Sequence, residues 1–378
     1  MRSRTGQKLT AAALMWPLMT GAAGAEDSLR LGLVAPDDGT LSIFGEQAAT
    51  ALEAFAESRT DLTVEVVPAP EPCDDEGAGE AASSLIEAGV DAVVGLFCVE
   101  TIDAAMPMLA ESAIPAITVS VRAGIVMEDA LSRGWPLFRL APSAEAEARR
   151  IAAIIAERWA DEPFALIEDG TIYGRDLAET VRLELEEMGI TPSFIDNYRP
   201  AEEMQFGLVR RLASAGVSHV FVGGDRSDVA VMARDAAAAD LGLTFMGGDA
   251  MRAADGVVPL PDGVYAVTAQ RPRDLDAQQE AIAAIETVLD ERGSEDVRPT
   301  DGYHLPLFAA AEILAEAKKD ATSMQMDEAL RSRTFKTAIG DIAFGRDQAI
   351  DGDTYRLTVS RNGSLRPVSP ADTETRQD

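Results

Sequence analysis

Two copies of one short phrase, two glycines followed by an aspartate, stand at 223–225 and 247–249 and could carry chemistry. Each phrase follows an apolar run, and the stretch 226–241 between them has the composition of a helix. A crossover of this length joins neighbouring parallel strands, so both phrases are predicted to end at the same carboxyl edge of one sheet. Open α/β sheets bind ligands at that edge, and glycines allow close approach of the backbone. We therefore expect Asp225 and Asp249 to project into a shared crevice.

A plainer interpretation is that each aspartate caps the helix that follows it. The repetition of the phrase in register favours a site. A carboxylate pair can transfer protons or hold a hard cation such as Ca²⁺. However, the sequence has no G-x-S-x-G elbow, no Walker A loop and no G-x-G-x-x-G fingerprint after a strand, and His219 and His304 lie in a predicted strand and helix. We expect no enzyme activity, no cofactor and no metal.

Length and composition place the chain among folded proteins of ordinary domain size. It has 378 residues, enough for two domains, and 47% of them are hydrophobic. The formal net charge is −31. Such an acidic chain is unsuited to nucleic acid, whose phosphates require Lys and Arg, and to anionic membrane surfaces.

The first 25 residues have the pattern of a cleavable secretory signal. Basic residues precede a short apolar core at 9–19, and small residues follow at 23–25, so cleavage is predicted after Ala25. The apolar core is too short to span a bilayer. We expect a soluble periplasmic or secreted protein. In that oxidising compartment the two cysteines, Cys73 and Cys98, favour a disulfide, although spacing alone does not show that they approach each other.

Strand and helix patterns alternate along the rest of the chain, as in a doubly wound sheet. Strands are predicted at 29–34, 62–67, 92–96, 116–119, 137–140, 164–167, 193–197 and 263–268, besides the two that end in the glycine phrases. Helices are predicted at 45–58, 80–88, 101–111, 144–159, 175–188, 206–215, 275–292, 303–317 and 326–331. A second cycle begins after 140, which indicates two sheets with hinge-like crossings near Pro142 and Pro272. A final hairpin at 354–366 is predicted to turn at Asn362 and Gly363.

From about 29 to this hairpin the chain resembles the type I periplasmic binding proteins of branched-chain amino acid ABC transporters, the leucine/isoleucine/valine-binding group. The resemblance rests on several short sequence motifs taken together: Phe44-Gly45, Cys73-Asp74-Asp75, Gly95-Leu96-Phe97-Cys98, Ile114-Pro115-Ala116-Ile117, Tyr173-Gly174, both Gly-Gly-Asp phrases and Ala338-Ile339-Gly340. Their order and spacing are more specific than any one of them.

The resemblance implies an α/β protein of two doubly wound, Rossmann-like lobes that are joined by a three-crossing hinge and close over a ligand. It implies a Cys73–Cys98 disulfide in the first lobe. The expected division is a signal at 1–25, a first lobe at 26–142 and 272–346, a second lobe at 143–271 and 347–370, and a tail at 371–378.

Matched position by position, the family's ligand site fits this chain in part. Phe44 and Tyr173 match aromatic residues that pack on the ligand, and Asp249 matches the acid that pairs with its α-ammonium. Asp225 replaces an aromatic residue. Around the family's carboxylate clamp, Val99 and Arg122 replace hydroxyl residues. The predicted ligand-binding set is Phe44, Val99, Glu100, Ser120, Arg122, Tyr173, Asp225 and Asp249.

Two roles are open for Arg122. Its guanidinium can replace the lost hydroxyls with stronger bonds to a ligand carboxylate. Alternatively, Asp225, Asp249 or Glu100 can consume it in a structural ion pair.

The resemblance implies a monomeric periplasmic solute-binding protein that delivers a small amino-acid-like ligand to an inner-membrane ABC permease. Two alternatives stay open. The same cleft can suit a polyamine, an amide or a metal cation, or the protein can be a regulator that reports ligand occupancy to a membrane receptor.

Overall fold

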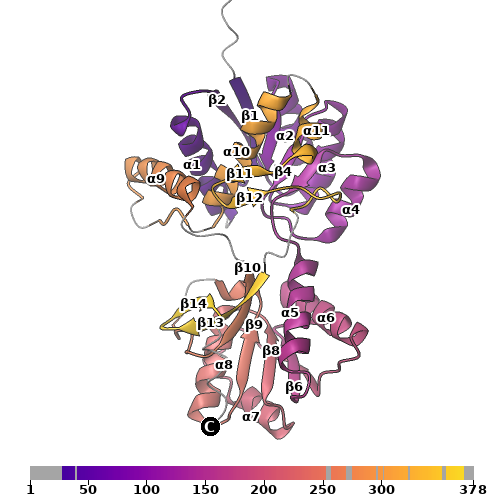
Figure 1. Cartoon of the computed structure of the whole chain (residues 1–378), viewed down its shortest axis with the longest axis vertical. Coiled ribbons are helices and arrows are strands. Elements are labelled where there is room, and N and C mark those ends of the chain that lie inside the picture. Colours follow the sequence, from indigo (N-terminus) through magenta and orange to yellow (C-terminus); the bar gives the residue numbers. More distant parts are fainter. Residues whose placement is uncertain are drawn as a thin grey trace, which may run out of the picture.

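The computed structural model describes residues 28–38, 41–252, 257–269, 275–294, 297–300, 302–321, 324–350 and 355–369. Two lobes lie one above the other, and the chain passes between them at 141–143 (Figure 1). The predicted signal at 1–25, the crossing at Pro272 and the tail at 371–378 lie outside the described residues.

The first lobe is built on a five-stranded parallel sheet in the order β2-β1-β3-β4-β5. Its strands are β1 (Ser28–Ala35), β2 (Thr63–Pro70), β3 (Ala92–Gly95), β4 (Ala116–Thr118) and β5 (Leu137–Arg139). The central strands are apolar runs that are buried on both faces, as parallel strands covered by helices should be.

Helices cover both faces of this sheet. One face carries α1 (Ser42–Ser58), α9 (Asp276–Glu291), α10 (His304–Asp320) and α11 (Met326–Ser332), whose apolar sides form one core with β1. The other face carries α2 (Asp75–Ala88), α3 (Val99–Glu111) and α4 (Gly124–Arg133). The short strands β11 (Phe335–Thr337) and β12 (Gly340–Ile342) pair beside α10.

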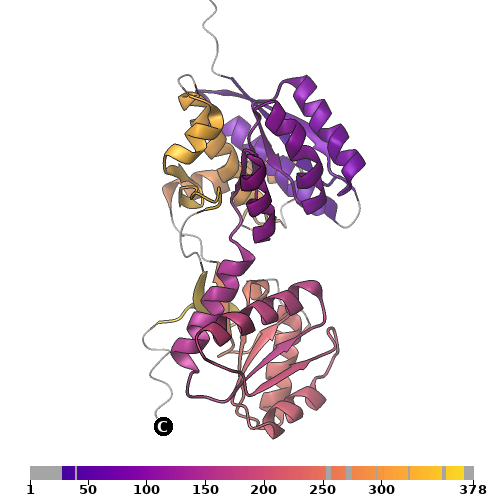
Figure 2. The same cartoon turned by 90° about the vertical axis from the view of Figure 1, so that its right-hand side faces the viewer.

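The second lobe has a seven-stranded sheet in the order β14-β13-β10-β9-β8-β6-β7. The parallel strands are β6 (Phe164–Glu168), β7 (Phe194–Asn197), β8 (His219–Gly223), β9 (Thr244–Gly247) and β10 (Tyr265–Ala269). The antiparallel strands β13 (Tyr355–Arg361) and β14 (Ser364–Pro367) extend it. Helices α5 (Ala144–Arg158) and α6 (Ile172–Glu187) pack on one face, and α7 (Phe206–Ser214) and α8 (Arg226–Ala238) on the other (Figure 2).

The predicted alternation, the two sheets and the final hairpin are confirmed. Asn362 and Gly363 both have positive φ, 52° and 74°, as a tight hairpin turn requires. The Cys73–Cys98 disulfide is present in the first lobe, with 5.5 Å between its Cα atoms. The sequence patterns did not predict α4 or the pair β11–β12, because these elements are short and each buries few residues.

The lobe boundaries themselves stay predictions. Near the C-terminal one, Gln348 still contacts the first lobe, because its side-chain amide donates to the carbonyls of Trp135 and Leu137. Tyr355, which begins β13, already pairs with Ala269 in the second sheet. Among the described residues no helix is long and apolar enough to cross a membrane.

A half-buried carboxylate in the first lobe makes stability depend on pH. Glu312 of α10 accepts a hydrogen bond from the Ala338 amide at 2.7 Å, and burial raises the pKa of Glu312 to about 7. The folded state therefore holds this proton more tightly than the unfolded state does. The stability that Glu312 contributes is complete below its unfolded pKa and is lost as the pH rises through about 7.

We predict that Glu312→Gln flattens the fall in unfolding free energy between about pH 5 and pH 7.5, because Gln keeps the acceptor without ionising. The fall due to Glu312 should reach at most about 3 kcal/mol. Urea unfolding at a series of pH values measures it. Glu187→Gln, an exposed position in the other lobe, is the control. An unchanged slope in Glu312→Gln would assign the pH dependence to other groups.

Candidate functional site

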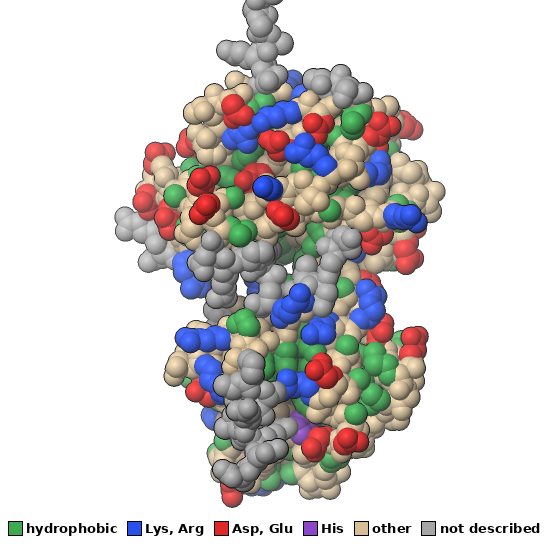
Figure 3. Space-filling model, viewed as in Figure 1, with side chains coloured by type: hydrophobic (Ala, Val, Ile, Leu, Met, Phe, Trp, Pro, Cys, Tyr) green, Lys and Arg blue, Asp and Glu red, His purple; other side chains and the backbone are tan. Residues whose placement is uncertain are grey.

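The predicted site residues form two groups, one in each lobe, in the loops and first helical turns that follow parallel strands. In the first lobe these loops follow β1, β3 and β4, and in the second they follow β6, β8 and β9. The lobes meet at a narrow waist, and Lys and Arg side chains surround it on the face seen in Figure 3. Arg122, in the loop after β4 of the first lobe, contacts Glu147 and Tyr355 of the second lobe across this waist.

A buried carboxylate outside the predicted set organises the candidate site. Glu147 lies in the first turn of α5, whose start is capped by Ser143, and its side chain has no exposed surface. One oxygen, Oε2, accepts from Nη2 of Arg122 at 2.6 Å. The other, Oε1, accepts from the Asp249 amide at 2.6 Å and from the Tyr173 hydroxyl at 3.2 Å. Glu147 thus joins three predicted site residues from separate elements.

Burial raises the pKa of Glu147, and the Arg122 guanidinium and the Asp249 amide partly offset this effect. Burial alone would lower the pKa of Arg122, but the carboxylate of Glu147 raises it overall, with a smaller contribution from Asp249. Burial also raises the pKa of Tyr173, so its hydroxyl keeps its proton and donates. The cluster therefore holds one cation between two carboxylates.

The second glycine of the second phrase makes room for Glu147. A Cβ at Gly248 would lie 2.4 Å from Oε1 of Glu147 and 2.8 Å from Cδ2 of Leu177. In the first phrase, a Cβ at Gly224 would lie 2.0 Å from the Tyr198 hydroxyl oxygen. Each phrase therefore lets a polar side chain approach the backbone at the strand end, but the side chain differs between the two copies.

Arg122 spans the waist with most of its donors engaged. Besides Glu147, Nη2 donates to the hydroxyl of Tyr355, and Nε donates to the Pro142 carbonyl at 3.2 Å. Nη1 lies 3.9 Å from Oδ2 of Asp249, and within the described ranges it donates no hydrogen bond. The Arg122 side chain is 28% exposed. Nη1 therefore faces the Asp249 carboxylate in a long ion pair without a hydrogen bond.

Asp249 is held on one side only. Oδ1 accepts from the Ala269 amide at 2.8 Å and lies 3.8 Å from Nη1 of Arg252. Oδ2 accepts no hydrogen bond from any part of the chain that the structure describes. The side chain is 17% exposed. Asp249 thus presents one carboxylate oxygen beside Nη1 of Arg122.

Asp225 does not join this group. It is exposed, precedes α8 without capping it through its side chain, and lies near Tyr198, Asp169 and Asp228. The Tyr198 hydroxyl donates to Asp228 at 3.4 Å. The two phrases end on adjacent parallel strands, as predicted, yet their carboxylates have different neighbours.

The first lobe contributes an aromatic patch, defined as Phe44, Phe97 and Tyr303. Phe44 stacks on Phe97 with 5.9 Å between ring centroids and 10° between ring planes. Tyr303 meets both rings edge-on at 5.2 Å. All three side chains are half-buried. Of the three, only Phe44 was predicted, because Phe97 and Tyr303 meet it through tertiary packing.

The loop that carries Phe97 is fixed by a second buried carboxylate. Glu71, at 2% exposure, accepts from the amides of Phe97 and Cys98 at 2.9 and 3.0 Å. The Ser120 hydroxyl donates to the Phe97 carbonyl at 3.3 Å. The remaining predicted residues, Val99 and Glu100, are exposed in the first turn of α3.

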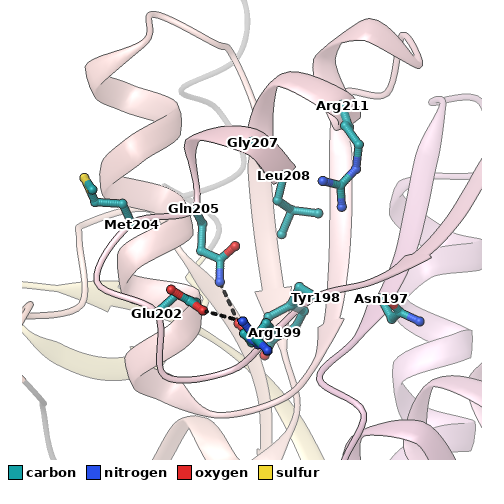
Figure 4. A pocket seen from close by; sticks show the side chains of 9 residues that line it. All are labelled: Asn197, Tyr198, Arg199, Glu202, Met204, Gln205, Gly207, Leu208 and Arg211. Atoms are coloured by element: carbon teal, nitrogen blue, oxygen red, sulfur yellow. Dashed lines mark hydrogen bonds and ion pairs between the residues drawn. The ribbon is translucent and has the colours of Figure 1, made fainter.

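A surface hollow of about 710 Å³ lies elsewhere on the second lobe, between the end of β7 and the start of α7 (Figure 4). Its charged side chains already have partners: Arg211 pairs with Asp196 at 2.8 Å, and Arg199 lies 3.7 Å from Glu202. None of its lining residues belongs to the Arg122 cluster. We therefore place the candidate site at the waist. The described residues include no group of three or more His, Cys, Asp or Glu side chains that could hold a metal ion.

Comparison with known proteins identifies the family. A family model described as periplasmic binding protein matches residues 28–364. The chain belongs to this family. Its relatives include a leucine-, isoleucine-, valine-, threonine- and alanine-binding protein of Pseudomonas aeruginosa, which is 26% identical over 345 residues and covers 89% of this chain and 90% of the relative.

Solved structures of the periplasmic binding protein fold superpose on most of the chain. An ABC transporter substrate-binding protein from Desulfitobacterium hafniense in complex with Leu has a TM-score of 0.65 at 19% identity, and covers 90% of this chain and 100% of its own. A solute-binding protein of an ABC transporter from R. palustris, in complex with 4-hydroxybenzoate, has a TM-score of 0.66 at 16% identity, with coverage of 93% and 100%. These likenesses establish the two-lobed fold.

The sequence position of Glu147 already distinguishes it from an ordinary acid at the start of a helix. It lies four residues before Ile151 and eight before Ile155, on the apolar stripe of α5. An acid in the first turn of a helix is usually solvated and favoured there by the helix dipole. A carboxylate on the apolar stripe is instead directed toward the core, where it needs a partner.

We predict that Gly248→Ala lowers the unfolding free energy by about 1–3 kcal/mol, because the new methyl group must displace Glu147 or Leu177. Gly242→Ala is the matched control in the same lobe, since a Cβ there meets nothing within 4 Å. It should change stability by less than about 0.5 kcal/mol. Chemical denaturation of the three proteins checks this. Equal stability of both variants would show that the close packing around Glu147 is not required.

Proposed function

We propose that this periplasmic binding protein is the solute-binding component of an ABC importer and holds a small amino-acid-like ligand between its lobes. The observation that carries the proposal is the facing pair of Nη1 of Arg122 and Oδ2 of Asp249, 3.9 Å apart. A zwitterionic head group supplies one partner for each. Its carboxylate accepts from Nη1, and its ammonium donates to Oδ2 in charge-assisted hydrogen bonds.

The aromatic patch suits the rest of such a ligand. Phe44, Phe97 and Tyr303 offer apolar ring surface from the first lobe, while the head-group partners Asp249 and Tyr173 belong to the second. Closing the lobes over the ligand would bring these two surfaces together, a hinge motion known for this class of fold. An apolar side chain on the ligand gains from burial against the rings.

The compartment and the partners follow from the same proposal. The family is periplasmic, and residues 1–25 have the pattern of a cleavable signal. The loaded protein would deliver its ligand, as a monomer and without nucleic acid, to an inner-membrane permease. The relative from P. aeruginosa, with its named amino-acid specificity, supports this reading.

The test is calorimetry on protein that has been unfolded and refolded to remove carried ligand, titrated with leucine and with 4-methylpentanoate, which lacks the amino group. We predict that leucine binds more tightly and that Asp249→Asn reduces its affinity by about 10–100-fold, because a charge-assisted bond is lost.

Asp240→Asn is the matched control, since it changes the same residue type at an exposed position of the same lobe, between α8 and β9 and outside the Arg122 cluster. It should leave affinity nearly unchanged. Binding of 4-methylpentanoate as tight as that of leucine would refute the amino-acid-like assignment and favour a simple carboxylic acid. Binding of polyamines or divalent metals alone would refute it as well.

A further inference from the structure

Arg122 and Asp249 have opposite charges and lie close together, yet they form only a long ion pair, with 3.9 Å between Nη1 and Oδ2 and no hydrogen bond. Two such groups in a partly buried place normally attract each other strongly. If the 3.9 Å between Nη1 and Oδ2 shortened to a hydrogen bond, the two groups would satisfy each other, and neither would be available to a ligand. Something in the structure keeps both groups apart.

Glu147 is in contact with both of them. Oε2 accepts from Nη2 of Arg122, whereas Nη1 is the nitrogen nearest Asp249, and Oε1 accepts from the backbone amide of Asp249. The first contact gives the guanidinium a counter-charge, and the second fixes the chain at the start of the 3₁₀ turn η2 (Asp249–Arg252). Gly248 allows this approach because it has no Cβ.

We infer that Glu147 is a positioning residue that makes the site specific for ligands with both a carboxylate and an ammonium group. Because Glu147 shares the charge of Arg122, Asp249 has only long ion pairs, at 3.8 Å to Arg252 and 3.9 Å to Arg122, and its Oδ2 keeps hydrogen-bonding capacity for an ammonium. Because Glu147 occupies the Nη2 side, Nη1 stays directed toward the ligand carboxylate. This inference rests on the proposed function and adds the residue that prevents the two head-group partners from pairing with each other.

The place of the pair in the fold supports this role. Arg122 belongs to the first lobe, while Glu147 follows the crossing at Pro142 by one helical turn, and Nε of Arg122 bonds to the Pro142 carbonyl. Displacements during lobe closure are smallest near the segment about which the lobes turn. The Arg122–Glu147 pair can therefore keep its geometry in open and closed forms.

The experiment compares Glu147→Gln, Asp249→Asn and the double variant with wild type, using leucine and 4-methylpentanoate as probes. Without the charge of Glu147, Arg122 should turn to Asp249, so Glu147→Gln should reduce the affinity for leucine at least about tenfold. In the double variant the Asp249 carboxylate, which competes with the ligand carboxylate for Arg122, is no longer charged. Affinity for 4-methylpentanoate should then recover to the level of Asp249→Asn alone, whereas leucine affinity should stay low.

Glu145→Gln is the matched control. Glu145 lies in the same helical turn and also reaches the first lobe, where Oε1 accepts from the Gly124 amide at 2.9 Å, but it does not contact Arg122. Its variant should bind both probes like wild type. If Glu147→Gln fails to fold, Glu147→Asp is the second variant, because a carboxylate one methylene shorter cannot reach both Nη2 of Arg122 and the Asp249 amide, and it should lower leucine affinity in the same direction.

Three results would overturn the inference. One is unchanged leucine affinity in Glu147→Gln, or in Glu147→Asp where that variant replaces it. Another is an equal loss for both probes with no recovery in the double variant, which indicates a purely structural role. If wild type binds leucine and either of these is found, only the role of Glu147 fails. If wild type binds no amino acid, the proposed function and this inference fail together.

Discussion

A carboxylate without exposed surface is stable in a protein only when fixed partners replace its water, and Glu147 depends on three of them. Arg122 supplies the counter-charge, the Tyr173 hydroxyl and the Asp249 amide supply hydrogen bonds, and Gly248 leaves the space. Each partner comes from a different loop or helix. The position of α5, α6 and the end of β9 is therefore tied to a single ionised group at the waist.

This arrangement divides the work between the lobes. The second lobe provides polar groups held by backbone amides at strand ends, and the first lobe provides the aromatic patch together with Arg122. Glu71 fixes the position of Phe97 in this patch, because its carboxylate accepts hydrogen bonds from the backbone amides of Phe97 and Cys98. In both halves of the candidate site a buried carboxylate thus fixes a loop, Glu147 through one backbone N–H and Glu71 through two. Such loops are preorganised, so less order has to be imposed when a ligand binds.

The two glycine phrases show how one local pattern serves two purposes. Both end adjacent parallel strands, and in both the second glycine admits a polar side chain close to the backbone. At Gly224 that side chain is Tyr198, which belongs to the loop after β7, and Asp225 stays exposed. At Gly248 it is Glu147, which reaches across from α5, and Asp249 becomes part of the charged cluster. The neighbours, and not the phrase, decide which aspartate joins the Arg122–Glu147 cluster.

The sequence by itself determined the features that depend on local order. Alternating apolar runs and helical stretches predicted two doubly wound sheets, and Asn362-Gly363 predicted the final turn. The resemblance to the family predicted the Cys73–Cys98 disulfide. It also placed Arg122, Tyr173 and Asp249 in one candidate site. Tertiary structure alone decided that Glu147 joins them, that Asp225 turns elsewhere, and that Phe97 and Tyr303 meet Phe44. The physical reason is that burial and ion pairing depend on distances between segments that are far apart in the chain. The periodicity of a helix shows which of its faces is buried, but it does not show which residues pack against that face.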